Sequence, residues 1–208
     1  MWYFIKTPWY LKRMYSNLMW DIPSREKIMY LTFDDGPHPI ATPFVLEQLK
    51  KYNAKGTFFC IGKNVMDHPA LYERLLSEGH VTANHTFNHL NGWQVTDEEY
   101  FKDIIDARKY IDSSLFRPPY GRITRFQAKH LTQSSLQFKI VMWDVVSGDF
   151  DTTITPEKCS VNVTRNAGAG SIVIFHDSEK AFPNLQKALP DTLEHFSAMG
   201  YRFDAITG

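Results

Sequence analysis

The chain has 208 residues, a length that fits one domain with a single hydrophobic core and leaves no room for a second. Hydrophobic residues make up 43% of it, so the chain is globular rather than disordered. Its 23 Lys and Arg balance 23 Asp and Glu, and this zero net charge argues against a nucleic-acid binder, which would carry a basic surface.

The N-terminal segment, residues 1–26, is expected to pack its aromatic residues, Trp2 to Trp20, against the domain formed by residues 27–208. Its first apolar run is soon interrupted by Lys6 and Pro8, so it does not have the pattern of a secretory signal. No apolar run of the sequence approaches the ~20 residues that cross a bilayer. We therefore expect a cytoplasmic protein, with association of this segment with the cell envelope as the alternative, and we favour a monomer.

From residue 29 onward, short apolar strands alternate with amphipathic helices. In chain order, strands are predicted at 29–33, 57–61, 81–84, 116–117, 138–143, 171–175 and 201–203, and helices at 42–52, 70–77, 97–112, 125–134, 156–166 and 182–199. This alternation predicts parallel βαβ units. About seven parallel strands without a nucleotide-binding fingerprint favour an α/β barrel. The two cysteines, Cys60 and Cys159, are far apart in the sequence and are predicted to be buried and free.

Two adjacent acids end the first predicted strand. Asp34 and Asp35 follow the apolar run and precede the chain-breaking pair Gly36 and Pro37. At the frayed end of a strand both carboxylates can lean over one cavity, and a metal ion is the commonest compensation for two acids held so close. Alone, the same residues also suit a solvated turn.

Other polar side chains recur just past the predicted strands, at His85, Arg117, Asp149 and His176. Active sites of α/β barrels are assembled at this edge. The HxxxH spacing of His85 and His89 places two imidazoles on one face of a helical turn, within reach of one ion. Alone it also fits a pair of surface histidines. With an aspartate from a neighbouring strand, two imidazoles form a set that suits Zn²⁺ and leaves a position for water.

Five short motifs therefore follow one another in order along the chain. They are Asp34-Asp35, His85-Thr86-Phe87-Asn88-His89, Arg117-Pro118-Pro119-Tyr120-Gly121, Trp143-Asp144 to Asp149-Phe150, and Ile174-Phe175-His176-Asp177. Together they resemble the polysaccharide deacetylases of the NodB-homology family, carbohydrate esterase family 4, from about residue 27 to the C-terminus. The resemblance implies a single-domain deformed (β/α) barrel and metal-dependent removal of N-acetyl groups from the amino sugars of peptidoglycan or a chitin-like oligosaccharide.

The resemblance also implies a role for each matching residue. Asp35, His85 and His89 would bind the metal, which we expect to be Zn²⁺, with Co²⁺ or Ni²⁺ as alternatives. Asp34 would act as the general base toward the attacking water. The backbone N–H of Tyr120 would stabilise the oxyanion together with the metal.

Three further roles complete the implied site. His176 would protonate the departing amine, Asp149 would stabilise the resulting charge on His176, and Arg117 would orient Asp34 and stabilise its charge. A small pocket for the acetyl group and the glycan would be lined by Trp143, Ile174, Pro119 and Phe150.

The sequence departs from the family pattern in its fourth motif, where Val146 and Phe150 stand in place of the usual Asp and Trp. We expect this change to affect the wall that faces the glycan more than the chemistry, since every implied catalytic position is intact. The alternatives are an amidase for a small non-glycan amide and a glycan-binding module without activity.

Overall fold

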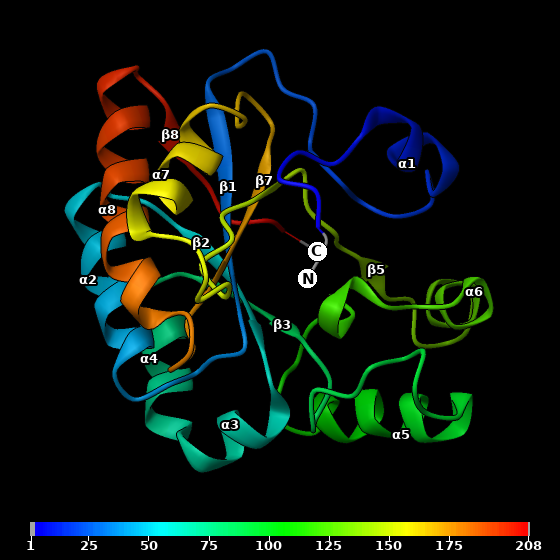
Figure 1. The fold of residues 1–208 in the computed structure, drawn as a ribbon. Helices are drawn as coiled ribbons and strands as arrows, with labels where there is room; N and C mark the ends of the chain where they lie inside the picture. Colours follow the sequence, from blue (N-terminus) through cyan, green and yellow to red (C-terminus); the bar gives the residue numbers. More distant parts are fainter. Residues whose placement is uncertain (1–2, 208) are drawn as a thin grey trace.

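One curled sheet of parallel strands runs through the computed structural model, which describes residues 3–207 (Figure 1). Along the sheet the order is β5 (Lys139–Ile140), β4 (Leu115–Phe116), β3 (Val81–Asn84), β2 (Gly56–Cys60), β1 (Ile28–Asp34), β7 (Ile172–His176) and β6 (Val145–Val146). The short strand β8 (Arg202–Phe203) pairs with the start of β1. The predicted α/β class and the seven or so parallel strands of a deformed barrel are thus confirmed.

Helices connect the successive strands except β5 and β6, and most helices begin and end within a few residues of the predicted positions. They are α1 (Trp9–Met14), α2 (Ala41–Lys51), α3 (Gly62–Asp67), α4 (Pro69–Ser77), α5 (Asp97–Arg108), α6 (Arg125–Gln133), α7 (Pro156–Thr164) and α8 (Phe182–Ala198). The sequence did not predict α1 or α3, whose six residues each are too few for a clear helical periodicity.

Aromatic side chains from three neighbouring strands form the centre of the core. Phe33 of β1 stacks on Phe58 of β2, with ring centroids 4.8 Å apart, and on Phe175 of β7 at 6.1 Å. All three are fully buried between the sheet and helices that include α2 and α8. The free cysteines Cys60 and Cys159 are buried in the same cluster, as predicted.

The predicted strand at 138–143 is wrong for most of its length, since β5 covers only Lys139–Ile140. The backbone carbonyls of Val141 and Met142, which would continue a strand, accept hydrogen bonds from the side chain of Arg117 at 3.0 and 2.8 Å. A buried guanidinium thus takes the place of a neighbouring strand at this position.

The N-terminal segment hydrogen-bonds to both ends of the sheet. Met142 N–H donates to the carbonyl of Met19 next to β5, and Val146 N–H of β6 donates to the carbonyl of Ile5. Through these bonds the segment spans the gap between the two outermost strands. Trp2, part of the predicted aromatic contact, lies outside the described residues. No helix among residues 3–207 is long and apolar enough to cross a bilayer.

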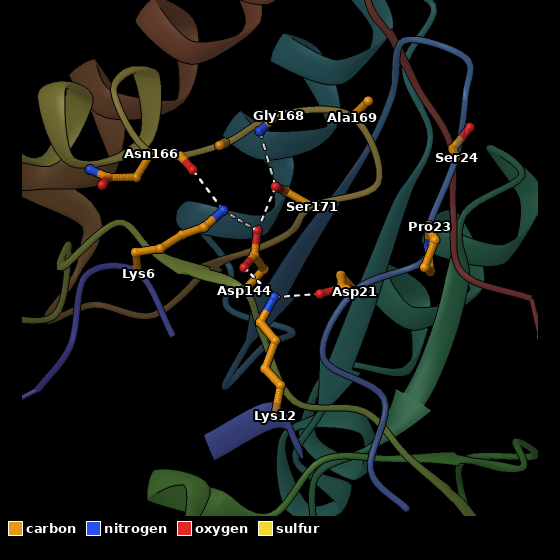
Figure 2. A pocket seen from close by; sticks show the side chains of 11 residues that line it. Lys6, Lys12, Asp21, Pro23, Ser24, Asp144, Asn166, Gly168, Ala169 and Ser171 are labelled. Carbon is orange, nitrogen blue, oxygen red and sulfur yellow. Dashed lines mark hydrogen bonds and ion pairs between the residues drawn. The ribbon is translucent and has the colours of Figure 1, made fainter. Parts of the chain in front are cut away.

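A cluster of charges fastens this segment at the amino ends of β6 and β7 (Figure 2). Asp144 is buried and accepts hydrogen bonds from Lys6 Nζ at 2.6 Å, Ser171 Oγ at 2.6 Å and Lys12 Nζ at 2.5 Å. Lys12 also pairs with Asp21. Burial alone would raise the pKa of Asp144, but the two lysines hold it below its usual value. The cluster borders a cavity of about 440 Å³ at the amino ends of these strands, opposite the end where Asp34 and His176 lie.

Candidate active site

Strand register brings the motif residues together at the carboxyl edge of the sheet. Asp34, the last residue of β1, pairs with His176, the last residue of β7. Asn84 of β3 pairs with Phe116 of β4, so the residues that follow them, His85 and Arg117, are also neighbours. Since these strands are parallel, their carboxyl ends meet at one edge, and side chains far apart in the sequence converge there.

Asp35, His85 and His89 form a group that could hold a metal ion. One ligand atom from each lies within 4.8 Å of the other two. Asp35 Oδ1 is 3.7 Å from His85 Nε2 and 3.2 Å from His89 Nε2. This oxygen is buried and has no hydrogen bond of good geometry among the described residues. A buried carboxylate oxygen without a donor, facing two imidazole nitrogens, fits a divalent cation.

The protonation of this group also suits metal binding. Burial lowers the pKa of His85 to about 4 despite the nearby acids, so the imidazole is neutral at pH 7. Its Nδ1 lies 2.8 Å from the carbonyl of Arg117, which assigns the proton to Nδ1 and leaves the lone pair of Nε2 free. For Asp35, burial would raise the pKa, but the nearby imidazoles of His89, His176 and His85 lower it overall.

The predicted helical turn over the HxxxH motif is wrong, because residues 85–89 form a loop. Thr86 and His89 both have a positive φ, of 65° and 59°, which no α-helix contains. Asp103 of α5 holds this loop in place, accepting from the backbone N–H of Asn88 at 2.9 Å and from its side-chain amide at 2.6 Å. The two imidazoles converge through this loop conformation rather than through helical spacing.

Asp34 lies beside this group and is paired with a buried arginine. Its Oδ1 accepts from Arg117 Nη1 at 2.6 Å, and its Oδ2 is 3.8 Å from His85 Nε2. Arg117 is fully buried, and its guanidinium carbon lies 3.9 Å from the centre of the Phe59 ring. Burial lowers the pKa of Arg117, and Asp34 opposes that effect. The aspartate is thus held in one orientation, with its second oxygen toward the candidate metal ligands.

His176 and Asp149 form a second charged pair at the same edge of the sheet. His176 Nδ1 is 2.8 Å from Asp149 Oδ1, and the backbone N–H of His176 donates to Asp149 Oδ2 at 2.7 Å. Burial would lower the pKa of His176, but the charge and hydrogen bond of Asp149 raise it to about 9. The imidazole is therefore protonated at neutral pH, and its second nitrogen, Nε2, can donate a proton.

The remaining predicted site residues surround these groups at different distances. Tyr120 OH is 3.1 Å from His89 Nδ1, and its backbone N–H donates to no other residue among those described. The Trp143 ring centre lies 5.8 Å from the Arg117 guanidinium, and the Phe150 ring packs edge-on against His176 at 5.1 Å. Pro119 is buried in the Arg117 loop and Ile174 is buried on β7, on the same face as His176.

Two residues that hold the site together, Asp177 and Asp103, had no role in the sequence-based prediction. Asp177 is fully buried, accepts from the backbone N–H of Gly36 at 3.2 Å and lies 2.5 Å from Thr42 Oγ1. Burial raises the pKa of Asp177 to about 8. It anchors the turn that follows Asp35, and Asp103 anchors the histidine loop. Asp177 stands next to His176 in the sequence, but that position does not reveal which way its side chain points.

Comparisons with known proteins agree with this site. A family model described as polysaccharide deacetylase matches residues 21–138, more than half of the chain. A peptidoglycan-N-acetylglucosamine deacetylase of Bacillus cereus is 37% identical over 194 residues, covering 90% of both chains. A chitooligosaccharide deacetylase of Azorhizobium caulinodans is 32% identical, covering 75% of this chain and 76% of the relative.

Among solved structures, the Bc1960 peptidoglycan N-acetylglucosamine deacetylase, in complex with 4-naphthalen-1-yl-N-oxidanyl-benzamide, superposes with a TM-score of 0.87. It is 31% identical, and the match covers 96% of this chain and 95% of that one.

Proposed function

The chain belongs to the polysaccharide deacetylase family, and on this premise we propose that it is a metal-dependent hydrolase that removes N-acetyl groups from the amino sugars of a glycan. The relatives named for peptidoglycan and for chitooligosaccharide support a glycan as the substrate. The reaction consumes water and releases acetate and a free amine on the sugar.

The observation that carries this proposal is the convergence of Asp35, His85 and His89 beside a separate acid and a separate base. These three residues would hold the cation, and Zn²⁺ is the metal that two imidazoles and a carboxylate suit best. When bound, a divalent cation of this kind polarises the amide carbonyl and lowers the pKa of water. A site built only to bind a glycan would not need the two charged pairs next to it.

Asp34 is the proposed general base. Its Oδ2 faces the candidate ligands, and it would take the proton from the water that attacks the amide carbon. Arg117 holds the other oxygen, Oδ1, through a hydrogen bond of 2.6 Å, and so fixes the orientation of the carboxylate. Among residues 3–207, Asp34 is the acid that pairs with Arg117, and the two residues work as a single unit in this proposal.

His176 is the proposed general acid. Its raised pKa, about 9, keeps it protonated at neutral pH, so it can give a proton to the departing sugar amine. Asp149 binds Nδ1, so Nε2, on the other side of the imidazole ring, is the nitrogen left to donate the proton. The acid and the base therefore have different environments: His176, the acid, lies beside an aspartate, and Asp34, the base, lies beside an arginine, as their opposite tasks require.

The backbone N–H of Tyr120 is the proposed oxyanion donor, and it has no competing acceptor among the described residues. Tyr120 follows Pro118-Pro119 and has a positive φ of 59°, and this backbone conformation sets the direction of its N–H. Gly121 is required next to it, because a Cβ at this position would lie 2.6 Å from the Trp143 ring. Trp143 can thus approach the loop closely and form a wall for the acetyl methyl group.

Acetate release from defined substrates tests the proposal. The wild-type protein, loaded with Zn²⁺, should release acetate from N-acetylated oligosaccharides and much less from small non-glycan amides. The Asp34→Asn variant should lose activity by at least about a hundredfold while still binding Zn²⁺. Near-normal turnover by that variant would show that Asp34 is not the base. Tight glycan binding by the wild type without any acetate release would instead support a non-catalytic binding module.

A further inference from the structure

A second hollow lies beside the candidate active site, between the loops that follow β3 and β4. It has a volume of about 460 Å³, and the residues that line it include Tyr15, Trp93, Val95, Asp97, Ile123 and Arg125. We call it the tryptophan groove. It opens on the same edge of the sheet as the motif residues, since both loops lead from the carboxyl ends of strands to the first turns of α5 and α6.

The groove is close to the candidate metal ligands. Trp93 follows His89 by four residues, and Ile123 follows Tyr120 by three, so the chain limits either Cα separation to at most about 14 Å. A short oligosaccharide spans such a distance. A glycan with one sugar at the catalytic cavity can therefore place a neighbouring sugar in the tryptophan groove.

Trp93 offers an aromatic platform at this position. Its side chain is 57% exposed, an unusual fraction for a residue of this size. The guanidinium of Arg122 lies 4.3 Å from the centre of its ring and covers one part of it. The rest of the indole remains open to solvent. Flat, rigid aromatic surfaces of this kind suit the apolar face of a pyranose ring.

Two arginines bring positive charge to the groove, Arg125 as part of its lining and Arg122 beside it, next to Trp93. Arg122 stacks on Trp93, and Arg125 lies 5.7 Å from the centre of the Tyr15 ring. The arginine ion pairs within residues 3–207 involve other arginines, at positions 74, 117 and 202. The carboxylate that lines the groove, Asp97, accepts a hydrogen bond from the buried side chain of Gln127 at 2.8 Å. Arg122 and Arg125 are both exposed and form no ion pair among residues 3–207, so each can pair with a carboxylate of a ligand.

We propose that the tryptophan groove binds a carboxylate-bearing sugar of the substrate, next to the sugar that is deacetylated. The platform stacks on the ring while Arg122 receives the carboxylate. In peptidoglycan every second sugar is muramic acid, which carries a lactyl carboxylate, whereas chitin oligosaccharides are neutral. The inference rests on the proposed function and deepens it, because it selects the acidic glycan over the neutral one.

Two oligosaccharides of equal length separate the contributions. One is a peptide-free peptidoglycan tetrasaccharide that alternates N-acetylglucosamine with N-acetylmuramic acid, and the other is chitotetraose. For the Arg122→Gln variant, kcat/KM for acetate release should fall about fivefold on the acidic substrate and less than about twofold on the neutral one. The Arg122→Lys variant keeps the charge and should recover part of the loss. Trp93→Ala should lose about tenfold on both substrates.

Matched controls are available elsewhere on the surface. Arg25→Gln removes an exposed arginine that precedes β1, and Trp9→Ala removes a tryptophan that is 74% exposed on α1. Neither should change kcat/KM on either substrate. The dissociation constants of both tetrasaccharides, measured by calorimetry in an Asp34→Asn background, should shift in parallel with kcat/KM.

The outcomes distinguish the two proposals. If the wild type releases no acetate from either tetrasaccharide, the proposed function fails, and the calorimetric constants still test the groove. If the wild type is active but Arg122→Gln affects both substrates equally, or neither, the groove proposal is overturned while the proposed function stands. An unaltered Trp93→Ala variant would likewise overturn it.

Discussion

Replacing Arg117 by Met tests the buried ion pair that supports the site. Arg117 is fully buried and donates four hydrogen bonds, two from Nη1, to Thr32 Oγ1 and Asp34 Oδ1, and two to the backbone carbonyls of residues 141 and 142. The variant leaves the carboxylate of Asp34 buried, with its Oδ1 deprived of a donor. We expect the free energy of unfolding to fall by about 3–5 kcal/mol, the cost of removing one partner of a buried pair.

A second substitution separates the uncompensated charge from the loss of packing. In the Arg117→Met/Asp34→Asn double variant the buried charge is absent, so the double variant should be more stable than the sum of the two single effects implies. We expect a coupling energy of at least about 1.5 kcal/mol.

Urea unfolding at pH 7, followed by circular dichroism after chelation of metals, measures all four proteins. A chelated sample keeps metal binding out of the comparison. The reasoning is refuted if Arg117→Met costs less than about 1 kcal/mol, or if the single effects simply add.

Three further predictions concern other charged groups. Asp149→Asn removes the cause of the raised pKa of His176. The alkaline limb of the pH profile of kcat/KM, expected near pH 9 for the wild type, should therefore move to pH 6.5 or below. A limb that does not move would exclude His176 as the general acid. The ion pair of His176 with Asp149 also contributes to the free energy of unfolding of the wild type. This contribution is complete below pH 6.5 and is lost as the pH rises through 9. Asp144→Asn should lower the free energy of unfolding by about 1–3 kcal/mol at pH 7. Because the pKa of Asp144 is lowered, that difference should shrink below pH 3.8, and a constant difference in urea melts would contradict it. Asp103→Ala should weaken Zn²⁺ binding about 10- to 100-fold in calorimetry, since it frees the loop at residues 85–89 that carries both histidines. The control variant Asp106→Ala, which removes a surface ion pair of α5, should leave Zn²⁺ binding unchanged.

Local sequence patterns were sufficient for most of the fold. The acidic first turn at Thr96 predicted the start of α5, and the capping box there, in which Thr96 and Glu99 bond each other's backbone, explains why. The apolar run before Asp34 predicted β1, whose position between β2 and β7 then places the two acids centrally. These elements are specified by residues close in sequence.

Features that depend on distant residues were missed. The spacing of His85 and His89 led to the prediction of a helical turn at 85–89. That spacing carries no information about the backbone, and so it could not reveal the positive φ of Thr86 and His89. That conformation depends on Asp103, fourteen residues beyond His89. The break after β5 likewise depends on Arg117, whose side chain occupies the backbone carbonyls that a strand would have used.

The site itself was predicted as a set of residues but not as a geometry. The sequence predicted Asp35 and the two histidines as one ligand set, although β2 lies between the strands that they follow. The role of Asp177 in holding the turn after Asp35 follows only from its burial and its contact with Thr42. Buried polar supports of this kind have no periodicity or motif of their own. The tryptophan groove was not predicted for the same reason, since it combines two loops with a residue of the N-terminal segment.

The most direct test of the account is an anomalous difference map at the zinc absorption edge, from crystals grown with Zn²⁺. The account predicts one peak bound by the Asp35 carboxylate and by Nε2 of His85 and of His89, each about 2.0–2.2 Å away. A fully reconstituted crystal with no peak between these three side chains, or with zinc bound only elsewhere, would contradict it.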